Sequence, residues 1–282
     1  MGIKIVTDST SDFPKALAAE LGVTIVPLNV HFGDEVYVDG VTISQEEFLD
    51  KLTKSAVMPR SSQPSPGAFK EVYEQLAADG SEIISIHIGE KLSGTIQSAR
   101  LAAEMLPEAK ITIVDTRSAT MAEGGLVCLA AEAAKAGKSK EEILDLLNRL
   151  IPAAADGNIL LVDTLEYLEK NGRIGKAASL LGSILSMKVL IRIDDIIHPV
   201  GKERGRAKAV KSLVNYAVSK AGKRPMRLFV AHVDAREEAE QIVDQLKQEL
   251  NLVGDVIFME MGPVISTHTG PKTVGVCWLP VE

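Results

Sequence analysis

The feature that most constrains the fold of this chain is a regular alternation of short aliphatic, β-branched runs with longer segments of helical periodicity. Near-continuous apolar runs such as EIISIHI are typical of strands that are covered on both faces, as in a parallel sheet. The predicted strands occupy residues 4–8, 24–32, 82–88, 110–115, 158–163, 188–193, 226–233, 255–261 and 273–279. The alternation therefore predicts an α/β fold in which helices pack on the sheets.

Helix starts are marked by polar pairs with the spacing of a capping box, in which each side chain bonds the other residue's backbone. The pairs are Ser44 with Glu47, Ser139 with Glu142, and Asp234 with Glu237. The segment PAAADG at 152–157 places a proline and small residues after a helical pattern, which indicates a domain boundary. We therefore predict an N-terminal α/β domain, residues 1–155, and a C-terminal α/β domain, residues 156–282.

The composition limits what the chain can bind. Its formal net charge of -7 argues against general nucleic-acid binding and leaves at most transient membrane contact. Aromatic residues are only 4%, so the interior must be aliphatic and offers little base stacking. Cys128 and Cys277 form no CxxC motif, which predicts neither a disulfide framework nor a metal site. The start MGIKIVTDST is too polar for a signal peptide, and no apolar run is long enough for a membrane span, so we expect a cytoplasmic protein.

The stretch RSSQPSPGAF concentrates serines and prolines ahead of a helical pattern. Ser65 followed by Pro66 predicts a helix start, because serine caps free N–H groups and proline at the first helical position sacrifices no hydrogen bond. Ser61 and Ser62 are not explained by that helix, because the next proline keeps this part of the chain extended. Their hydroxyls either bond the loop backbone or contact a ligand.

A second candidate site lies in EIISIHIGEKLSGTIQSARLAAEML, which predicts a strand, a loop and a helix that begins near Ser93. Ser93, Gly94 and Thr95 would lie at the carboxyl end of a parallel strand, where open α/β sheets bind ligands. Free N–H groups at a helix start favour an anionic head group, and Gly94 allows a ligand to approach the backbone closely. A simple helix cap is the alternative interpretation.

His268 in VISTHTGPKTVGV is the third candidate. It stands before Gly270 and Pro271, between two strand-like runs, where we expect a tight turn. A histidine at such a strand end can donate a hydrogen bond to a carboxylate or a phosphate, and a structural role is the alternative.

Two further segments resemble sites but lack the required pattern. GRIGKAAS at 172–179 has the wrong spacing for a phosphate-binding loop, since Ala177 follows the lysine where Ser or Thr is needed. In TDSTSD, Asp8 is a single carboxylate among hydroxyls, and we expect Ser11 or Asp12 to cap a helix there.

Taken together, these segments resemble the DegV family, the fatty-acid-binding proteins also called FakB. The matching segments are VTDST, SSQPSPGAF, KLSGTIQSA, VDTRSAT, LEYLEKNGRIGKAASLLGSILSMKVLI and HTGPKTVGV, in family order over residues 3–279. The resemblance implies two α/β domains related to dihydroxyacetone kinase, the first an α/β/α domain with a parallel sheet and the second with a mixed sheet. It also implies a long-chain, palmitate-like fatty acid between the domains, and no cofactor or metal.

The resemblance also implies which residues hold the fatty-acid carboxylate. They are Ser61, Ser62, Ser93, Gly94, Thr95 and His268. The chain departs from the family at two positions. Ser61 replaces the usual threonine but keeps its hydroxyl, and Lys272 replaces a glycine in the HTGPK turn.

The resemblance further implies that a separate ATP-dependent fatty acid kinase converts the bound acid to an acyl phosphate. On this interpretation the chain is a lipid-binding subunit and not itself an enzyme. The alternative is a stand-alone phosphotransferase or hydrolase that uses Ser93 and His268, and a third possibility is a regulatory module without a lipid.

A basic segment offers a docking surface for such a kinase. Residues 201–227 carry nine Lys or Arg against one Glu. Lys202, Arg204 and Arg206 crowd a turn before a helix, where the helix dipole opposes positive charge, so we expect them to meet an external anion. Arg173, in the NGRIGK turn, is a further candidate for the same surface.

Overall fold

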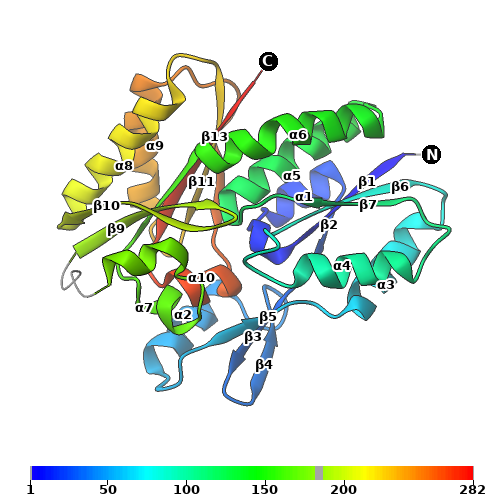
Figure 1. The fold of residues 1–282 in the computed structure, drawn as a ribbon, viewed down its shortest axis with the longest axis horizontal. Coiled ribbons are helices and arrows are strands. Elements are labelled where there is room, and N and C mark those ends of the chain that lie inside the picture. Colours follow the sequence, from blue (N-terminus) through cyan, green and yellow to red (C-terminus); the bar gives the residue numbers. More distant parts are fainter. Residues whose placement is uncertain (1, 182–186, 282) are drawn as a thin grey trace.

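The computed structural model describes residues 2–181 and 187–281 and contains two large β-sheets side by side, with helices on their faces (Figure 1). A small three-stranded sheet lies beneath them, near the line where the two large sheets approach each other. Within those two ranges of residues, no helix is both long and apolar enough to span a membrane.

The N-terminal half forms a four-stranded parallel sheet in the order β2-β1-β6-β7. These strands are β2 (Val23–Val26), β1 (Ile3–Asp8), β6 (Glu82–His87) and β7 (Ile111–Asp115). One face is covered by α3 (Pro66–Ala77) and α4 (Thr95–Glu104), and the other by α1 (Lys15–Leu21) and α5 (Thr120–Lys135). Because both faces are covered, consecutive residues such as Ile83 and Ile84 are both fully buried.

The C-terminal half forms a six-stranded mixed sheet in the order β10-β9-β8-β13-β11-β12. These strands are β10 (Ile196–Arg204), β9 (Met187–Asp194), β8 (Asn158–Val162), β13 (Val274–Pro280), β11 (Met226–His232) and β12 (Ile257–Glu260). Only β11 and β12 pair in parallel, and the other pairs are antiparallel. The outer face packs against α8 (Arg206–Ala221) and α9 (Arg236–Glu249), and the inner face against α5 and α6 (Lys140–Asp156).

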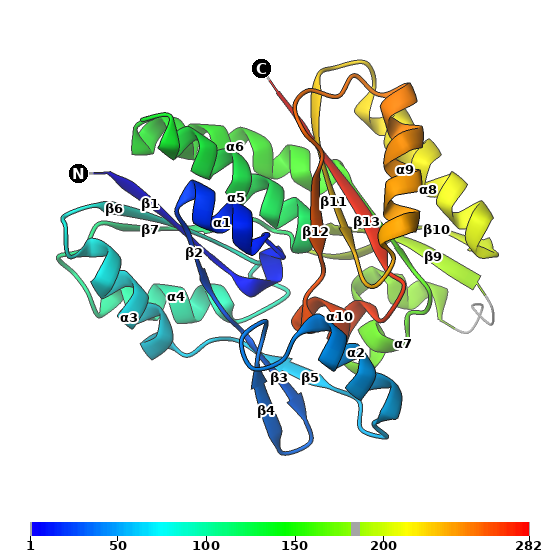
Figure 2. The same cartoon turned by 180° about the vertical axis from the view of Figure 1, so that it is seen from behind.

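The small sheet is antiparallel, in the order β4-β3-β5. Its strands are β4 (Glu35–Val38), β3 (Asn29–Phe32) and β5 (Arg60–Ser62). Three short helices gather beside it, as Figure 2 shows from behind: α2 (Gln45–Lys54), α7 (Glu166–Lys170) and α10 (Pro263–Thr269). Two 3-10 turns, η1 (Ser9–Ser11) and η2 (Gly175–Leu180), complete this region.

Helix α5 lies between the two large sheets and packs against both of them. Its glycine pair makes this close approach possible. A Cβ on Gly124 would lie 2.5 Å from the Ser11 carbonyl oxygen, and a Cβ on Gly125 would lie 2.9 Å from the Phe229 ring. The result is a single hydrophobic core that runs through both halves of the chain. The division into residues 1–155 and 156–282 stays a prediction, and the two parts share this core.

The predicted fold class is confirmed, because a parallel sheet and a mixed sheet are both present. One predicted strand is wrong. Residues 24–32 form two strands, β2 and β3, which belong to different sheets. Pro27 lies at the break, and proline cannot supply the N–H that a continuous ladder requires. Strands β4, β5 and β10 were not predicted.

Most of the predicted helix starts are confirmed. Ser44 and Ser139 form complete capping boxes, and Ser65 caps α3 with Pro66 in its first turn. Asp234 caps nothing, because its φ of 44° puts it in the left-handed region and α9 begins after Ala235. The expected caps at Ser11 and Asp12 are also wrong, since α1 starts after Pro14 without a side-chain cap.

Candidate functional site

A narrow cavity opens beside α10, between residues from the two halves of the chain. Its volume is about 70 Å³. Most of its wall is aliphatic, with Leu28 and Ile88 from the N-terminal half and Leu160, Ile193 and Ile197 from the mixed sheet. Its polar lining is Thr10, Ser61, Ser62, Gln63, Ser93, Thr120, Arg173, His268 and Thr269. Such a cavity suits an aliphatic ligand with one polar end.

Ser61 and His268 meet at this cavity. Ser61 lies on β5, where it pairs with Val30, and its Oγ is 2.7 Å from Nε2 of His268. Burial, with a smaller effect from Arg173, lowers the pKa of His268 to about 4, so the imidazole is neutral at pH 7. Nδ1 of His268 has no hydrogen-bond partner in the described part of the chain. His268 occupies the last turn of helix α10, and not the tight turn that we predicted.

Ser93 also lines the cavity, and no hydrogen bond joins it to His268 in the described residues. Its Oγ lies 2.9 Å from Oγ1 of Thr95 and accepts a hydrogen bond from the Thr95 N–H at 3.3 Å. The hydroxyl therefore closes the first turn of α4 and faces the cavity as well. Both interpretations of the SGT segment, cap and ligand contact, fit this position.

The remaining predicted carboxylate-site residues lie around these three. Ser62 lines the cavity, but its Oγ lies 2.8 Å from Nε2 of His31. Gly94 and Thr95 are not among the lining residues. A Cβ on Gly94 would lie 2.9 Å from the Gln63 side chain, so this glycine gives room to Gln63.

Arg173, predicted for kinase docking, lies in the cavity lining itself. Its Nε donates to the Leu92 carbonyl at 3.1 Å, and its Nη1 donates to the Asn171 carbonyl at 3.0 Å. These bonds hold a positive charge close enough to His268 to lower the pKa of that imidazole. A carboxylate bound at this end of the cavity would therefore meet a cation.

The other predicted docking residues lie at the end of β10 and the start of α8. Arg204 is exposed, while Arg206 is half-buried among acidic side chains. Arg206 donates from Nη1 to Asp163 at 2.7 Å and from Nε to Glu238 at 3.0 Å. The charge of Arg206 is thus compensated within the chain, which removes our reason for expecting an external anion there. Docking stays a prediction for Lys202 and Arg204.

Lys272 lies in the turn that follows α10. Its φ is 60°, a left-handed conformation that costs a lysine free energy which a glycine does not pay. Its Nζ lies 3.2 Å from the Asp234 carboxylate, and its carbonyl accepts a hydrogen bond from Arg206. These contacts tie Lys272 to Asp234 and Arg206 in the turn after α10.

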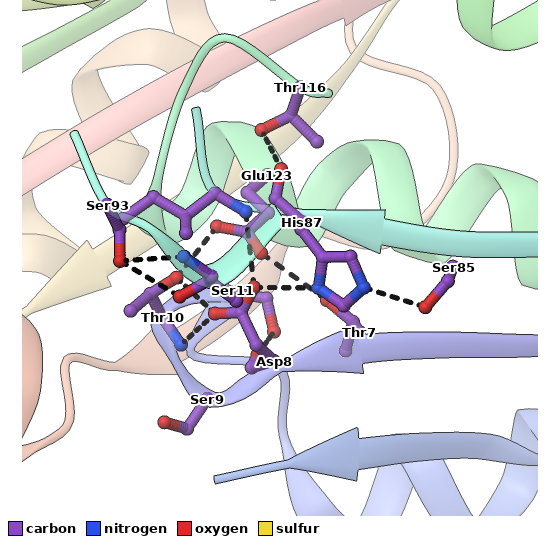
Figure 3. A network of polar contacts seen from close by, with 12 residues as sticks. Thr7, Asp8, Ser9, Thr10, Ser11, Ser85, His87, Ser93, Thr116 and Glu123 are labelled. Atoms are coloured by element: carbon purple, nitrogen blue, oxygen red, sulfur yellow. Dashed lines mark hydrogen bonds and ion pairs between the residues drawn. The ribbon is translucent and has the colours of Figure 1, made fainter. Parts of the chain in front are cut away.

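The sequence analysis missed a polar network inside the N-terminal half (Figure 3). Ser85 Oγ lies 2.7 Å from Nε2 of His87, and Nδ1 of His87 lies 2.9 Å from Oδ2 of Asp8. This is the order of a hydrolase triad, but all three residues have an exposed fraction of 0%. Ser85 also bonds the Tyr73 hydroxyl at 2.8 Å. The network is therefore structural, because no substrate can reach the serine.

The network continues to the cavity wall through Thr10, whose backbone N–H and hydroxyl both bond the Asp8 carboxylate. The Thr10 hydroxyl also lies 3.1 Å from the Glu123 carboxyl group. Burial, and then the charge of Asp8, raise the pKa of Glu123 well above its usual range. Asp8 at the end of the first strand was the signal in the sequence, although its partners are distant in the chain.

Thr120 is another residue that the sequence analysis left without a role. It is buried in the cavity wall at a φ of 50°, which is rare for a β-branched residue. Its hydroxyl has no hydrogen-bond partner in residues 2–181 and 187–281. No group of three or more His, Cys, Asp or Glu side chains in those same ranges could hold a metal ion.

Comparisons with known proteins agree on one family. A family model described as "Uncharacterised protein, DegV family COG1307" matches residues 2–281. A DegV domain-containing protein of Deinococcus radiodurans is 38% identical over 287 residues, with all of both chains covered. A structure described as fatty acid binding of a DegV family protein from Thermus thermophilus has a TM-score of 0.93 at 34% identity, with 100% of each chain covered. The structure of DegV from Bacillus subtilis, described as a fatty acid binding protein, has a TM-score of 0.83 at 31% identity, again with 100% of each chain covered.

Proposed function

The chain belongs to the DegV family, and we propose that it binds a long-chain fatty acid in this cavity, with the carboxylate held by Ser61, Ser93 and His268. The observation that carries the proposal is the hydrogen-bonded pair of Ser61 and His268 at an otherwise aliphatic cavity. Solved relatives described as fatty acid binding proteins support the class of ligand.

The chemistry of the site fits a carboxylate. An ionised carboxylate only accepts hydrogen bonds, so it needs donors, and hydroxyls and an imidazole N–H supply them. Arg173 adds a positive charge to the same lining. These donors fix the position of the head group, with a net gain of about 1 kcal/mol for each hydrogen bond.

The aliphatic wall supplies most of the affinity. Burial of one methylene contributes about 0.8 kcal/mol, so a palmitate-like chain gains on the order of 12 kcal/mol before the costs of ordering. The wall residues are branched aliphatic side chains from both halves of the chain, which suit a flexible acyl chain of no fixed shape.

We further propose that the bound acid is presented, in the cytoplasm, to a separate ATP-dependent fatty acid kinase that forms the acyl phosphate. The resemblance of the sequence motifs to the FakB proteins supports this step. The docking residues that we retain are Arg173, which lines the cavity, and the exposed Lys202 and Arg204 at the end of β10. A stand-alone phosphotransferase or hydrolase that uses Ser93 and His268 is the alternative.

The ligand is tested by denaturing mass spectrometry of the purified protein. We expect a long-chain fatty acid in near-stoichiometric amount, and its replacement by an added fatty acid of different length. A protein that arrives without lipid and binds none when fatty acid is added would contradict the proposal. Turnover of an acyl ester or of ATP by the protein alone would favour the stand-alone enzyme instead.

A further inference from the structure

Helix α10, which carries His268, begins without a side-chain cap of its own. The N–H groups of the first residues of a helix need partners from outside the helix. Pro263 has no N–H, so the groups to be satisfied at this start include those of Gly262 and Val264. Two carboxyl groups from the distant N-terminal half of the chain lie at this helix start, and one of them accepts the Gly262 N–H.

Asp12 and Asp39 supply these carboxylates. Oδ1 of Asp12 accepts the N–H of Gly262 at 2.8 Å across 250 positions of sequence. The buried carboxyl group of Asp39 lies beside the Val264 N–H and the Ser9 side chain, and its Oδ2 has no hydrogen-bond partner in the described residues. The two carboxylates flank one point, since a Cβ on Gly262 would lie 3.1 Å from Asp39 and 3.6 Å from Asp12.

We propose that Asp12 and Asp39 are positioning residues that clamp the start of α10 and thereby hold His268 against Ser61. One part of this inference rests on the proposed function, namely that fatty-acid binding depends on the position of His268. Gln45 adds a third contact to α10, because its Nε2 donates a hydrogen bond to Oγ of Ser266 at 2.8 Å. His268 lies within two turns of the clamp, so a shift of the helix start displaces the imidazole.

Both acids of the clamp are buried, and burial raises the pKa of each. Asp39 is 5% exposed and Asp12 is 8% exposed, and burial is the main reason that the pKa of Asp39 rises to about 7. Burial likewise raises the pKa of Asp12 well above its usual range. Three charged groups face Asp39: Asp8 and Asp12, which disfavour its ionisation, and Lys15, which favours it. Asp12 and Asp39 line a surface groove, distinct from the cavity at His268, which is also lined by His232, Arg236 and Glu260.

The direction in which pH shifts the clamp follows from the difference in the pKa of Asp39 between the closed and the open state. Asp39 has a pKa of about 7 when the clamp is closed, and a lower, ordinary carboxyl pKa once opening exposes it to water. The closed state therefore binds the proton more tightly, and a rise in pH favours opening. Between pH 6 and pH 8 the equilibrium constant for opening should increase by about tenfold.

An asparagine at position 39 imitates the protonated acid, because its amide has one acceptor and one donor group. Asp39→Asn should therefore keep the clamp closed and remove its pH dependence. Asp39→Ala should open the clamp at every pH. Glu260→Gln is the matched control. Glu260 also lines the groove that contains Asp39, but it is exposed and does not contact the start of α10 as Asp39 does.

The deciding experiment is amide hydrogen exchange of the ligand-free protein at pH 6 and pH 8, read on peptides that span 261–270. After correction for intrinsic exchange rates, protection should fall about tenfold in the wild type and in Glu260→Gln, and stay level in Asp39→Asn. An equal fall in Asp39→Asn, or full protection in Asp39→Ala, would overturn the inference.

Binding of palmitate at pH 6 is the second measurement. Asp39→Ala should weaken it about fivefold or more, while Asp39→Asn should bind as the wild type does. Loss of protection in Asp39→Ala with unchanged affinity would overturn the link to His268. Failure of the wild type to bind any fatty acid would contradict the proposed function and leave the exchange result to decide the clamp by itself.

Discussion

The Ser61 hydroxyl lies 2.7 Å from Nε2 of His268, so a single hydrogen bond joins strand β5 of the N-terminal half to helix α10 of the C-terminal half. The two residues are 207 positions apart in the chain. Their contact places two potential donors at one end of an aliphatic cavity, and the effects of changing either residue can be predicted from it.

Loss of a head-group donor should weaken fatty-acid binding without unfolding the protein. We expect Ser93→Ala and His268→Ala each to raise the dissociation constant for palmitate by a factor of about five to thirty, because each leaves a desolvated carboxylate short of a hydrogen bond. Fluorescence competition measures the affinity, and circular dichroism checks the fold. Wild-type affinity in both variants would reduce these residues to structural caps.

The serines of RSSQPSPGAF should separate into two roles. Ser65 accepts the N–H of Ala68 at the start of α3, so Ser65→Ala should lower the free energy of unfolding by about 1 kcal/mol and leave binding unchanged. Ser61→Ala should weaken palmitate binding and leave the free energy of unfolding nearly unchanged. Urea denaturation and palmitate titration on both variants test this, and a ligand-bound structure with Ser61 turned to solvent would disprove the assignment.

The kinase step should depend on basic residues other than Arg206, whose charge Asp163 and Glu238 compensate. We expect Arg204→Glu to slow acyl-phosphate formation with a cognate kinase, mainly through slower and salt-dependent association. The double variant Arg173→Glu, Arg204→Glu should abolish it, because Arg173 also lines the cavity. Arg204→Glu alone should leave palmitate binding intact. Arg206→Glu is the contrasting variant. It should mainly lower stability, because it places a third acid beside Asp163 and Glu238. Full phosphorylation of the double variant would rule out this docking surface.

Acid should destabilise the protein partly through His268. The pKa of this imidazole is about 4 in the folded chain, below its ordinary value of 6.5, so the unfolded state binds the proton more tightly. The contribution to stability is therefore complete above pH 6.5 and is lost as the pH falls toward 4, by up to about 1.4 kcal/mol per pH unit. Thermal melts from pH 7 to pH 5 should show a smaller loss for His268→Gln than for the wild type. Equal losses would contradict this assignment.

The buried network of Ser85, His87 and Asp8 should contribute stability and no catalysis. Asp8→Asn should destabilise the fold by about 3 kcal/mol, because it leaves buried partners of the carboxylate poorly matched. Ser85→Ala should leave any esterase signal at the level of the wild type. A signal that disappears in Ser85→Ala would mean that substrate reaches the network.

Three of the four strands of the parallel sheet, β1, β6 and β7, are predicted to within a residue or two, because apolar runs are typical of strands covered on both faces. The fourth strand, β2, is predicted as one strand with β3. It predicts β10 poorly, because Pro199 and Gly201 interrupt the run. The structure accommodates them with a register shift on an edge strand, where a missing N–H is tolerated.

The candidate site could be predicted only in part. Ser61, Ser93 and His268 stood out as unexplained polar residues within motifs that resemble one family, and all three line the cavity. Asp12 and Asp39 could not be assigned in this way, because they lie against the backbone of α10. Every residue type except proline has a backbone N–H group, so the sequence does not show which of these groups an acid will contact. Arg173 was assigned to an outer surface since nothing local shows that the turn after α7 reaches the cavity.

Helix α5, with Gly124 against the Ser11 carbonyl and Gly125 against Phe229, has a mechanical consequence. A helix that is packed to van der Waals contact with two sheets at once leaves no hinge about which the halves could swing apart. The chain should unfold cooperatively, in one transition, even though it contains two sheets. A ligand as long as a fatty acid must then enter by local displacement of short elements at the cavity mouth, such as α7 and α10, while the sheets stay together.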